Sequence, residues 1–276
     1  MHQDRKHGSS LDAIATALED LYRTYNKREF VHPDPLEFLY DYDEPLDREI
    51  VALVASSLAY GRVAQILKSV EWVLSRMPQP REFLMSSTPS SLRKALRGFK
   101  HRFTTGDEMA SMLSSARRAI ERFGSLEKCF MSGIGAEDES LIPGLTAFVE
   151  TLKSEMTDSC GSLLPDPAHG SACKRLNLFL RWMVRQDDVD PGGWYNLSPA
   201  GLFVPLDVHM HRIALALGLT GRKQADMRTA IEITDAFRMI SPADPVRYDF
   251  ALTRLGIRDD CDPEGFFGRC GVTIDG

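Results

Sequence analysis

The stretch Val204-Pro205-Leu206-Asp207-Val208-His209-Met210-His211-Arg212 decides how the rest of the chain is interpreted. Apolar residues continue from it at helical spacing to a stop at Gly218, which predicts a helix that begins near Asp207. An aspartate at this position accepts hydrogen bonds from the first free backbone N–H groups of a helix. Asp207 is therefore predicted to be the N-cap, either as a structural cap alone or also as a functional carboxylate.

Apolar residues recur at spacings of three and four along most of the chain, which is typical of helices. The longest such stretch covers residues 47–77 and is broad enough for a buried helix. It is interrupted at Tyr60-Gly61-Arg62, where Gly61 marks a turn between two helices or a close approach of the backbone. No segment alternates convincingly as a strand, so we predict an all-α fold of about ten helices.

No clear linker divides the chain, so we expect residues 1–276 to form a single all-α unit with two helical lobes. The predicted lobes are residues 46–156 and 171–256, with a loop at 157–170 between them. The Gly-rich tail, residues 259–276, is predicted to be irregular.

Composition excludes several classes of protein. The chain is 43 % apolar and 26 % charged, with a net charge of −6 that argues against coating nucleic acid non-specifically but permits a local basic face. The first twenty residues lack the apolar core of a signal peptide, and no apolar run could span a bilayer, so we expect a cytoplasmic protein without a membrane partner. Five scattered cysteines without a C-x-x-C pair indicate reduced thiols.

A second candidate, Lys174, lies far upstream of Asp207 in a helix predicted over residues 171–185. At about 100° per residue, Lys174, Arg181 and Arg185 share a stripe opposite the apolar face. Such a stripe is either a solvated surface or one wall of a basic groove. Arg62 and Lys100 are the other candidates for the walls of that groove.

Metal and nucleotide sites have weak support. His209 and His211 lie about 200° apart on one helix and cannot share an ion. Asp207 and His211 could share one, but no third ligand is visible nearby, so a metal-dependent hydrolase is the weakest alternative. Neither of the glycine motifs that bind nucleotide phosphates, G-x-x-x-x-G-K-[ST] and G-x-G-x-x-G, occurs in the sequence. We therefore predict no metal and no cofactor.

The stretch from Val204 to Ile213 resembles the V-D-T-H-x-x-R-V stretch of the helix-hairpin-helix DNA glycosylases, the endonuclease III and oxoguanine glycosylase superfamily. Glu49-Ile50-Val51-Ala52-Leu53-Val54-Ala55-Ser56-Ser57-Leu58-Ala59 looks like the early buried helix of that family. The resemblance implies a two-lobed glycosylase-like fold and a catalytic Asp207, with His209 and Arg212 matching the neighbouring pattern. The whole chain also looks like an uncharacterised bacterial family, catalogued as a domain of unknown function, related to this superfamily.

The chain departs from that pattern in two places. The family's phosphate-binding hairpin reads roughly L-P-G-V-G-x-K, whereas this chain has Asp190-Pro191-Gly192-Gly193-Trp194 in that region and no nearby lysine. Lys174 resembles instead the upstream helical lysine of an archaeal oxoguanine glycosylase branch. The four-cysteine iron–sulfur loop of endonuclease III is also missing, because Cys261 and Cys270 are too few.

The resemblance implies a DNA base-excision repair glycosylase, with or without abasic-site lyase activity, that acts on a damaged or modified base. A carboxylate such as Asp207 stabilises positive charge that develops on the sugar, and a lysine such as Lys174 attacks C1′ to form a Schiff base. The flipped base needs aromatic partners, for which Tyr60, Trp194 and Tyr195 are the candidates, although each of them taken singly is more often a core residue. The residues predicted to contact DNA or the base are Tyr60, Arg62, Arg175, Arg181, Arg185, Trp194, Tyr195 and His209.

A second hypothesis is a non-catalytic module that binds DNA or a modified nucleotide on the same scaffold. The missing hairpin and the net acidity favour this module, whereas the capped helix and Lys174 favour the enzyme. We expect a monomer in either case.

Overall fold

The computed structural model describes residues 3–138, 140–154, 156, 163–167, 170–258 and 260–272, with side chains from residue 11 onward. Helices dominate this part of the chain, and its one sheet is a hairpin of two short antiparallel strands. The predicted all-α fold is confirmed. The larger elements are α1 (Gln3–Tyr25), α2 (Pro45–Ser57), α3 (Val63–Leu74), α4 (Pro80–Ser86), α5 (Pro89–Ala95), β1 (Lys100–His101), β2 (Thr104–Thr105), α6 (Gly106–Phe123), α7 (Leu126–Met131), α8 (Ile142–Ser154), α9 (Lys174–Val184), α10 (Val208–Ala216), α11 (Met227–Ile240), α12 (Asp249–Arg254) and α13 (Pro263–Arg269).

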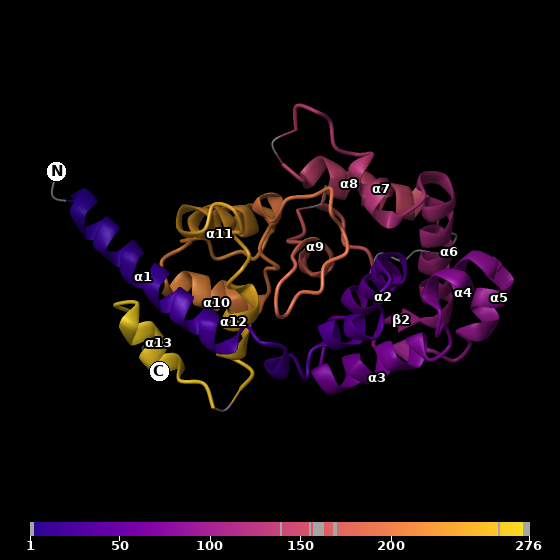
Figure 1. The fold of residues 1–276 in the computed structure, drawn as a ribbon, viewed down its shortest axis with the longest axis horizontal. Helices are drawn as coiled ribbons and strands as arrows, with labels where there is room; N and C mark the ends of the chain where they lie inside the picture. Colours follow the sequence, from indigo (N-terminus) through magenta and orange to yellow (C-terminus); the bar gives the residue numbers. More distant parts are fainter. Residues whose placement is uncertain are drawn as a thin grey trace.

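The helices gather into two groups on either side of α9 (Figure 1). One group holds α2 to α8, with α6 packed against α4, α5, α7 and α8. The other holds α10 to α13 together with α1, which packs against α12 and α13. The first helix of the chain therefore lies with the last ones. Our division into lobes at 46–156 and 171–256 did not include α1, and it stays a prediction. The predicted loop at 157–170 lies mostly outside the described residues.

Helix α2 is the centre of the packing. Its residues are buried from Glu49 to Ser57, and the apolar sequence covers all sides of the helix, as burial on every side requires. It packs against α9 and against the 3-10 helix Pro35–Asp41. Helix α9, which begins at Lys174, is thus held against this buried helix.

The predicted break at Gly61 is confirmed. Helix α2 ends at Ser57, α3 begins at Val63, and Gly61 between them has φ of +98°. A Cβ placed on Gly61 would lie 2.9 Å from Cδ of Arg102, so the residue serves both as a turn and as a point of close approach.

The prediction of an irregular tail at 259–276 was wrong for its middle part. Helix α13 covers Pro263–Arg269, and Asp262 caps it by accepting a hydrogen bond from the Gly265 N–H. Phe266 and Phe267 anchor the helix in the core. The segment contains a signal for the start of a helix, an aspartate N-cap followed by proline, but its glycines led to the prediction of an irregular tail.

None of the helices in the described part of the chain is long and apolar enough to cross a membrane.

Candidate functional site

Asp207 occupies the predicted N-cap position. Its backbone is extended, and its Oδ1 accepts a hydrogen bond of 2.9 Å from the Met210 N–H in the first turn of α10. The prediction of Asp207 at a helix N-terminus is confirmed. Because one carboxylate oxygen serves the cap, the other is directed to a different partner.

That partner is Lys174. Its Nζ lies 3.1 Å from Oδ2 of Asp207, and the two side chains are 35 % and 25 % exposed. Lys174 is the first residue of α9, and the turn before it is fixed: Cys173 has φ of +48°, and the Asn177 side chain donates to the Ala172 carbonyl. The fold thus brings together two residues that are distant in sequence and leaves both accessible to solvent.

The Asp207 carboxylate is held in its ionised form. Burial alone would raise its pKa, but the Lys174 ammonium, the Met210 N–H and the charge of His209 outweigh that effect and hold the pKa below its usual value. Asp207 therefore carries a full negative charge near neutral pH, as the stabilisation of a cation requires.

Arg175 follows Lys174 and points to another element. Its Nη1 donates a hydrogen bond of 2.8 Å to the carbonyl of Ser57, and its guanidinium carbon lies 5.0 Å from the centroid of the Tyr60 ring. Burial lowers the pKa of Arg175, and no ion pair to it occurs among the described residues. A partly buried cation without a carboxylate partner, beside Lys174, is suited to binding an anion.

A pocket of about 250 Å³ opens between α10, α12 and α13. His209 and Arg212 provide its polar groups, and its apolar wall includes Ile213, Leu252 and Phe267. His209 is exposed and lies close enough to Asp207 to help lower the pKa of that carboxyl. The two α10 residues that matched the sequence pattern therefore lie at one pocket.

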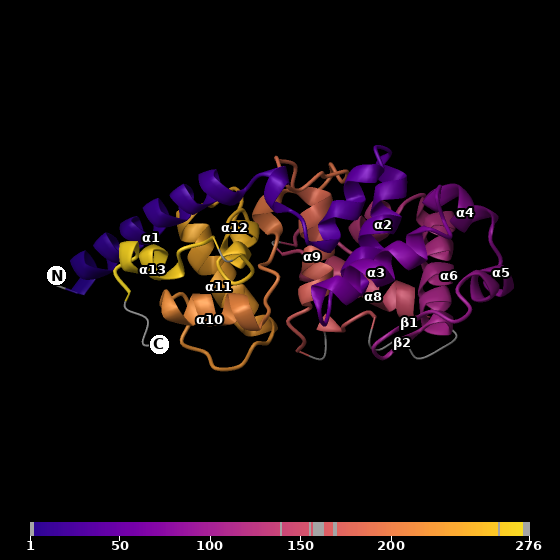
Figure 2. The same ribbon diagram turned by 90° about the horizontal axis from the view of Figure 1, so that it is seen from below.

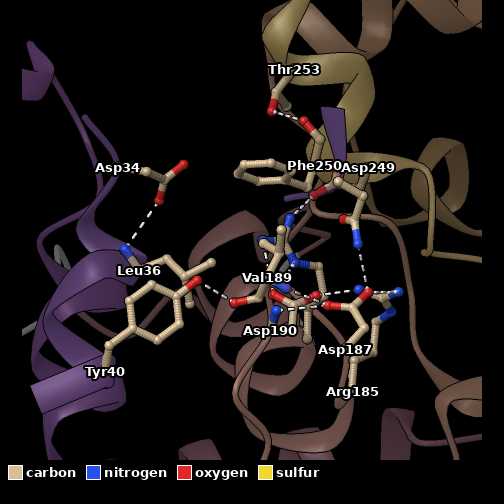
Figure 3. A network of polar contacts seen from close by, with 12 residues as sticks. Asp34, Leu36, Tyr40, Arg185, Asp187, Val189, Asp190, Asp249, Phe250 and Thr253 are labelled. Atoms are coloured by element: carbon tan, nitrogen blue, oxygen red, sulfur yellow. Dashed lines mark hydrogen bonds and ion pairs between the residues drawn. The ribbon is translucent and has the colours of Figure 1, made fainter. Parts of the chain in front are cut away.

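Arg181 and Arg185 do not line a groove, and this prediction was wrong. Both side chains are only 3 % exposed and lie in a buried ionic network (Figure 3). Arg181 pairs with Asp190 and Asp249, while Arg185 pairs with Asp187, Asp190 and Asp244. The stripe predicted from the helical period exists, but the chain after α9 and the start of α12 cover it with carboxylates.

Trp194 is a core residue, so its predicted role in stacking on a base was wrong. It is buried, its ring packs edge-on against Phe179, and its indole N–H donates to Oε2 of Glu49 at 3.1 Å. Tyr195, Arg62 and Lys100 are exposed, as contact with a ligand requires.

The loop in the place of the glycosylase hairpin packs on the protein itself. The N–H groups of Gly192 and Trp194 donate to the carbonyls of Trp182 and Met183 at the end of α9. Arg48 donates to the Gly192 carbonyl from the other side. These two N–H groups are therefore occupied and do not form a phosphate site.

Two buried acids were missed by the sequence analysis. Glu49 accepts hydrogen bonds from the backbone N–H groups of Leu126 and Glu127 as well as from Trp194, and burial raises its pKa to about 7. Asp249 is buried beside Arg181, and burial raises its pKa to about 6, with the charge of Asp207 acting in the same direction. An acid within an apolar run was the one available signal for Glu49.

A metal centre has no support in the part of the chain that the structure describes. It contains no group of three or more His, Cys, Asp or Glu side chains that could hold an ion. His211 is largely buried and donates from Nε2 to the Arg222 carbonyl at 2.7 Å. Its Nε2 is thus occupied by a backbone carbonyl, which weakens the geometric basis of a metal-dependent hydrolase that uses Asp207 and His211.

A family model described as a protein of unknown function (DUF2400) matches residues 34–258. The chain belongs to the DUF2400 family. Searches of the curated proteins and of the solved structures each found no match.

Membership in DUF2400 confirms the resemblance to a family catalogued as a domain of unknown function, and it corrects the assignment to a glycosylase superfamily. The stretch around Asp207 predicted membership in the helix-hairpin-helix glycosylase superfamily, but the match is to DUF2400, and no comparison gives evidence of that superfamily. A short stretch around one capped helix was not specific enough, because an aspartate N-cap before a helix is common in unrelated folds. In this DUF2400 member the site must be interpreted from its own geometry.

Proposed function

We propose that Lys174 and Asp207 form a catalytic pair that cleaves the N-glycosidic bond of a base in DNA and then the strand at the resulting abasic sugar. The observation that carries the proposal is the distance of 3.1 Å between Lys174 Nζ and Asp207 Oδ2 in a solvent-accessible site. An amine nucleophile and an ionised carboxylate side by side are the groups that this reaction needs.

The reaction would begin with loss of a proton from the Lys174 ammonium to water, which leaves Asp207 ionised. The nitrogen lone pair then forms a bond to C1′ of the sugar, and the electrons of the glycosidic bond leave with the base, which takes up the proton that the nitrogen gives up. Expulsion of the ring oxygen, which is protonated to a hydroxyl, leaves an iminium. Loss of a C2′ proton then expels the 3′ phosphate, and water hydrolyses the imine to restore Lys174.

Asp207 and Arg175 would act around this centre. The ionised Asp207 stabilises positive charge on the sugar in the transition state. Arg175, which has no ion-pair partner among the described residues, would hold a backbone phosphate next to Lys174. The pocket beside His209 would hold the base.

The alternative is a binding module without catalysis. The observation that favours it is that both Asp207 oxygens are already engaged, one by the Met210 N–H and one by Lys174. In this module the pair would only join the start of α9 to the start of α10.

Borohydride trapping distinguishes the two functions. Borohydride reduces an imine to a stable amine, so the wild-type protein should form a covalent adduct with oligonucleotides that carry oxidised, deaminated or abasic sites. Lys174→Ala should abolish the adduct. Lys153→Ala is a matched control, because Lys153 Nζ lies 2.9 Å from Oδ2 of Asp166 with side chains 32 % and 23 % exposed, and it should trap like wild type.

Asp207→Asn tests the carboxylate separately. Asparagine keeps the N-cap, so the variant should fold normally, yet loss of the charge should slow the reaction by about 10²–10³-fold. Absence of an adduct with every substrate would contradict the enzyme and favour the binding module. Equal trapping by the Lys174→Ala protein would remove Lys174 from the reaction.

A further inference from the structure

The hairpin of β1 and β2 presents an aromatic side chain to solvent. Phe103, at its tip, is 75 % exposed, although exposure of a large apolar side chain gains nothing for folding. Its neighbours Lys100 and Arg102 are exposed cations, and the Arg102 guanidinium lies 5.6 Å from the Phe103 ring centroid. The tip thus combines one aromatic face with flanking positive charge.

The hairpin is rigid below this tip. His101 is buried, its Nε2 donates to the Tyr60 carbonyl at 3.0 Å, and its Nδ1 lies 2.8 Å from the Ser69 hydroxyl. Burial lowers the pKa of His101, so the ring is held neutral. The Tyr60 hydroxyl bonds the His101 carbonyl and the Thr104 hydroxyl on the other strand. A preorganised tip loses little conformational freedom when it binds.

Arg102 itself is held in an unusual backbone conformation. Its φ of +51° lies in the left-handed region, which a residue with a Cβ rarely adopts. Its side chain lies over Gly61, in the turn before α3. Among the described residues, Cys173, directly before Lys174, is the other non-glycine with positive φ. Such strain concentrates at functional sites, so its occurrence at the tip suits a contact surface.

The tip is joined to the candidate site by direct contacts. Tyr60 bonds both strands of the hairpin, and Arg175 lies over the Tyr60 ring, one residue from Lys174. In Figure 2 the hairpin and α10 lie along the same lower edge of the molecule. A ligand that reaches Lys174 can therefore extend onto the hairpin.

The surface around the hairpin is basic despite the net charge of −6. Arg62 is exposed at the start of α3, close to Arg102. A cavity of about 660 Å³ beside Thr105 of β2 is lined by three cations, Arg93, Lys94 and Arg97, and by one acid, Asp107. Cations of this density attract a polyanion rather than an apolar partner.

We infer that the hairpin tip is a nucleic-acid contact, in which Phe103 stacks on an unpaired base while Arg102, Lys100 and Arg62 bind the flanking phosphates. An aromatic ring between cations matches the alternation of base and phosphate along a strand. The inference rests on the proposed function for the choice of DNA as the ligand. It adds a binding residue that the Lys174 chemistry does not require.

Stacking on Phe103 requires a base that has left its own stack. The hairpin should therefore prefer single-stranded DNA, or a duplex opened at an abasic site, over an intact duplex. An acidic peptide or a lipid surface has no bases to stack and would show no such preference.

Fluorescence anisotropy with labelled oligonucleotides tests the contact. Phe103→Ala should weaken binding to a single strand on the order of tenfold, and Phe103→Trp should retain it. Met239→Ala is the matched control, because Met239 is also 75 % exposed but lies on α11, and it should bind like wild type. Equal binding by Phe103→Ala and Met239→Ala would overturn the inference.

The salt dependence of binding tests the cations. Arg102→Gly removes the guanidinium and suits the left-handed backbone, so it should lower the slope of log affinity against log salt by about one. Arg23→Ala, an exposed arginine of α1, should leave the slope unchanged. An unchanged slope for Arg102→Gly would contradict the phosphate contact.

The proposal for the hairpin and the proposal for the catalytic pair are tested by separate measurements. Adduct formation by the wild type decides the proposed chemistry, and the ratio of affinities of Phe103→Ala and Met239→Ala decides the hairpin. No binding to any oligonucleotide, or Phe103-dependent binding to phosphatidylserine vesicles in place of DNA, would overturn the inference.

Discussion

At the scale of single residues, burial decides which charges are available. Lys174 and Asp207 stay accessible to solvent, whereas Glu49 is enclosed by α2, α7 and the Trp194 indole. Three N–H groups donate to the Glu49 carboxyl, yet the cost of desolvating its charge exceeds their effect. Glu49 therefore has a structural role, and its protonation is linked to folding.

The contribution of Glu49 to the stability of the folded protein should fall as pH rises from about 4.5 to 7. Glu49 keeps its proton in the folded chain up to about pH 7, whereas an unfolded glutamate loses it near its ordinary value of 4.5. Unfolding between these values releases a proton from Glu49, so the contribution of this residue to stability decreases with pH, by a few kcal/mol at about 1.4 kcal/mol per pKa unit.

Urea denaturation of the wild type and Glu49→Gln across this range measures the effect. The glutamine does not ionise, so the wild type should lose stability relative to the variant as pH rises. A difference in unfolding free energy that is constant from pH 4.5 to 7 would contradict the role of Glu49.

At the scale of elements, the turn between α2 and α3 positions the hairpin. The turn holds Gly61 at φ of +98°, and the Arg102 side chain fills the space where a Cβ would project. Tyr60 in the same turn bonds both strands. The three residues that interrupt the apolar helical pattern therefore form a turn that supports the basic tip of the β1–β2 hairpin.

Gly61→Ala should destabilise the protein more than Gly98→Ala. Both glycines have positive φ, which costs an alanine about 1 kcal/mol or more. A Cβ on Gly61 would also meet Arg102, whereas a Cβ on Gly98 meets nothing within 4 Å.

Thermal unfolding of the two variants and of Gly61→Ala combined with Arg102→Gly checks this. Removal of Arg102 should restore part of the stability lost by Gly61→Ala. Equal losses for the two glycine variants would show that Arg102 does not constrain the turn.

At the scale of the whole molecule, a buried ionic network joins segments from both ends of the chain. Arg185, directly after α9, binds Asp187 and Asp190 (Figure 3). It also binds Asp244, and Tyr22 of α1 donates to Asp187. Removal of one partner from such a network leaves uncompensated charge in a low-dielectric interior. The network therefore fixes how α9, and with it Lys174, lies against the C-terminal helices.

Arg185→Met should destabilise the protein by about 3–5 kcal/mol, because it leaves three carboxylates with less compensation. Arg23→Met provides the control, since Arg23 pairs with Glu19 at the surface of α1 and exposed pairs contribute little. Urea denaturation measures both variants. A loss for Arg185→Met no larger than that for Arg23→Met would contradict a structural role of the network.

The local sequence pattern was sufficient to predict much of the fold and the position of Asp207 in the site. The helical periods, the break at Gly61 and the Asp207 N-cap depend on residues that are near one another in sequence. A helix start, a turn and a period of apolar residues are local properties, so the chain specifies them before it folds. Helix α13 in the tail was not predicted, because the glycines of this segment indicated an irregular structure more strongly than its N-cap indicated a helix.

Only the tertiary structure decided which charged side chains are exposed to solvent and which are buried. Lys174 and Arg181 lie on one face of α9, and Arg185 directly follows the helix. Lys174 reaches Asp207 at the surface, whereas the two arginines are enclosed by the carboxylates of Asp187, Asp190, Asp244 and Asp249. The helical period fixes the face of a helix but not what covers it, because that depends on segments far away in sequence. The energy of a charge depends on this covering, through desolvation and pairing, so the separation of site residues from structural ones came from the fold.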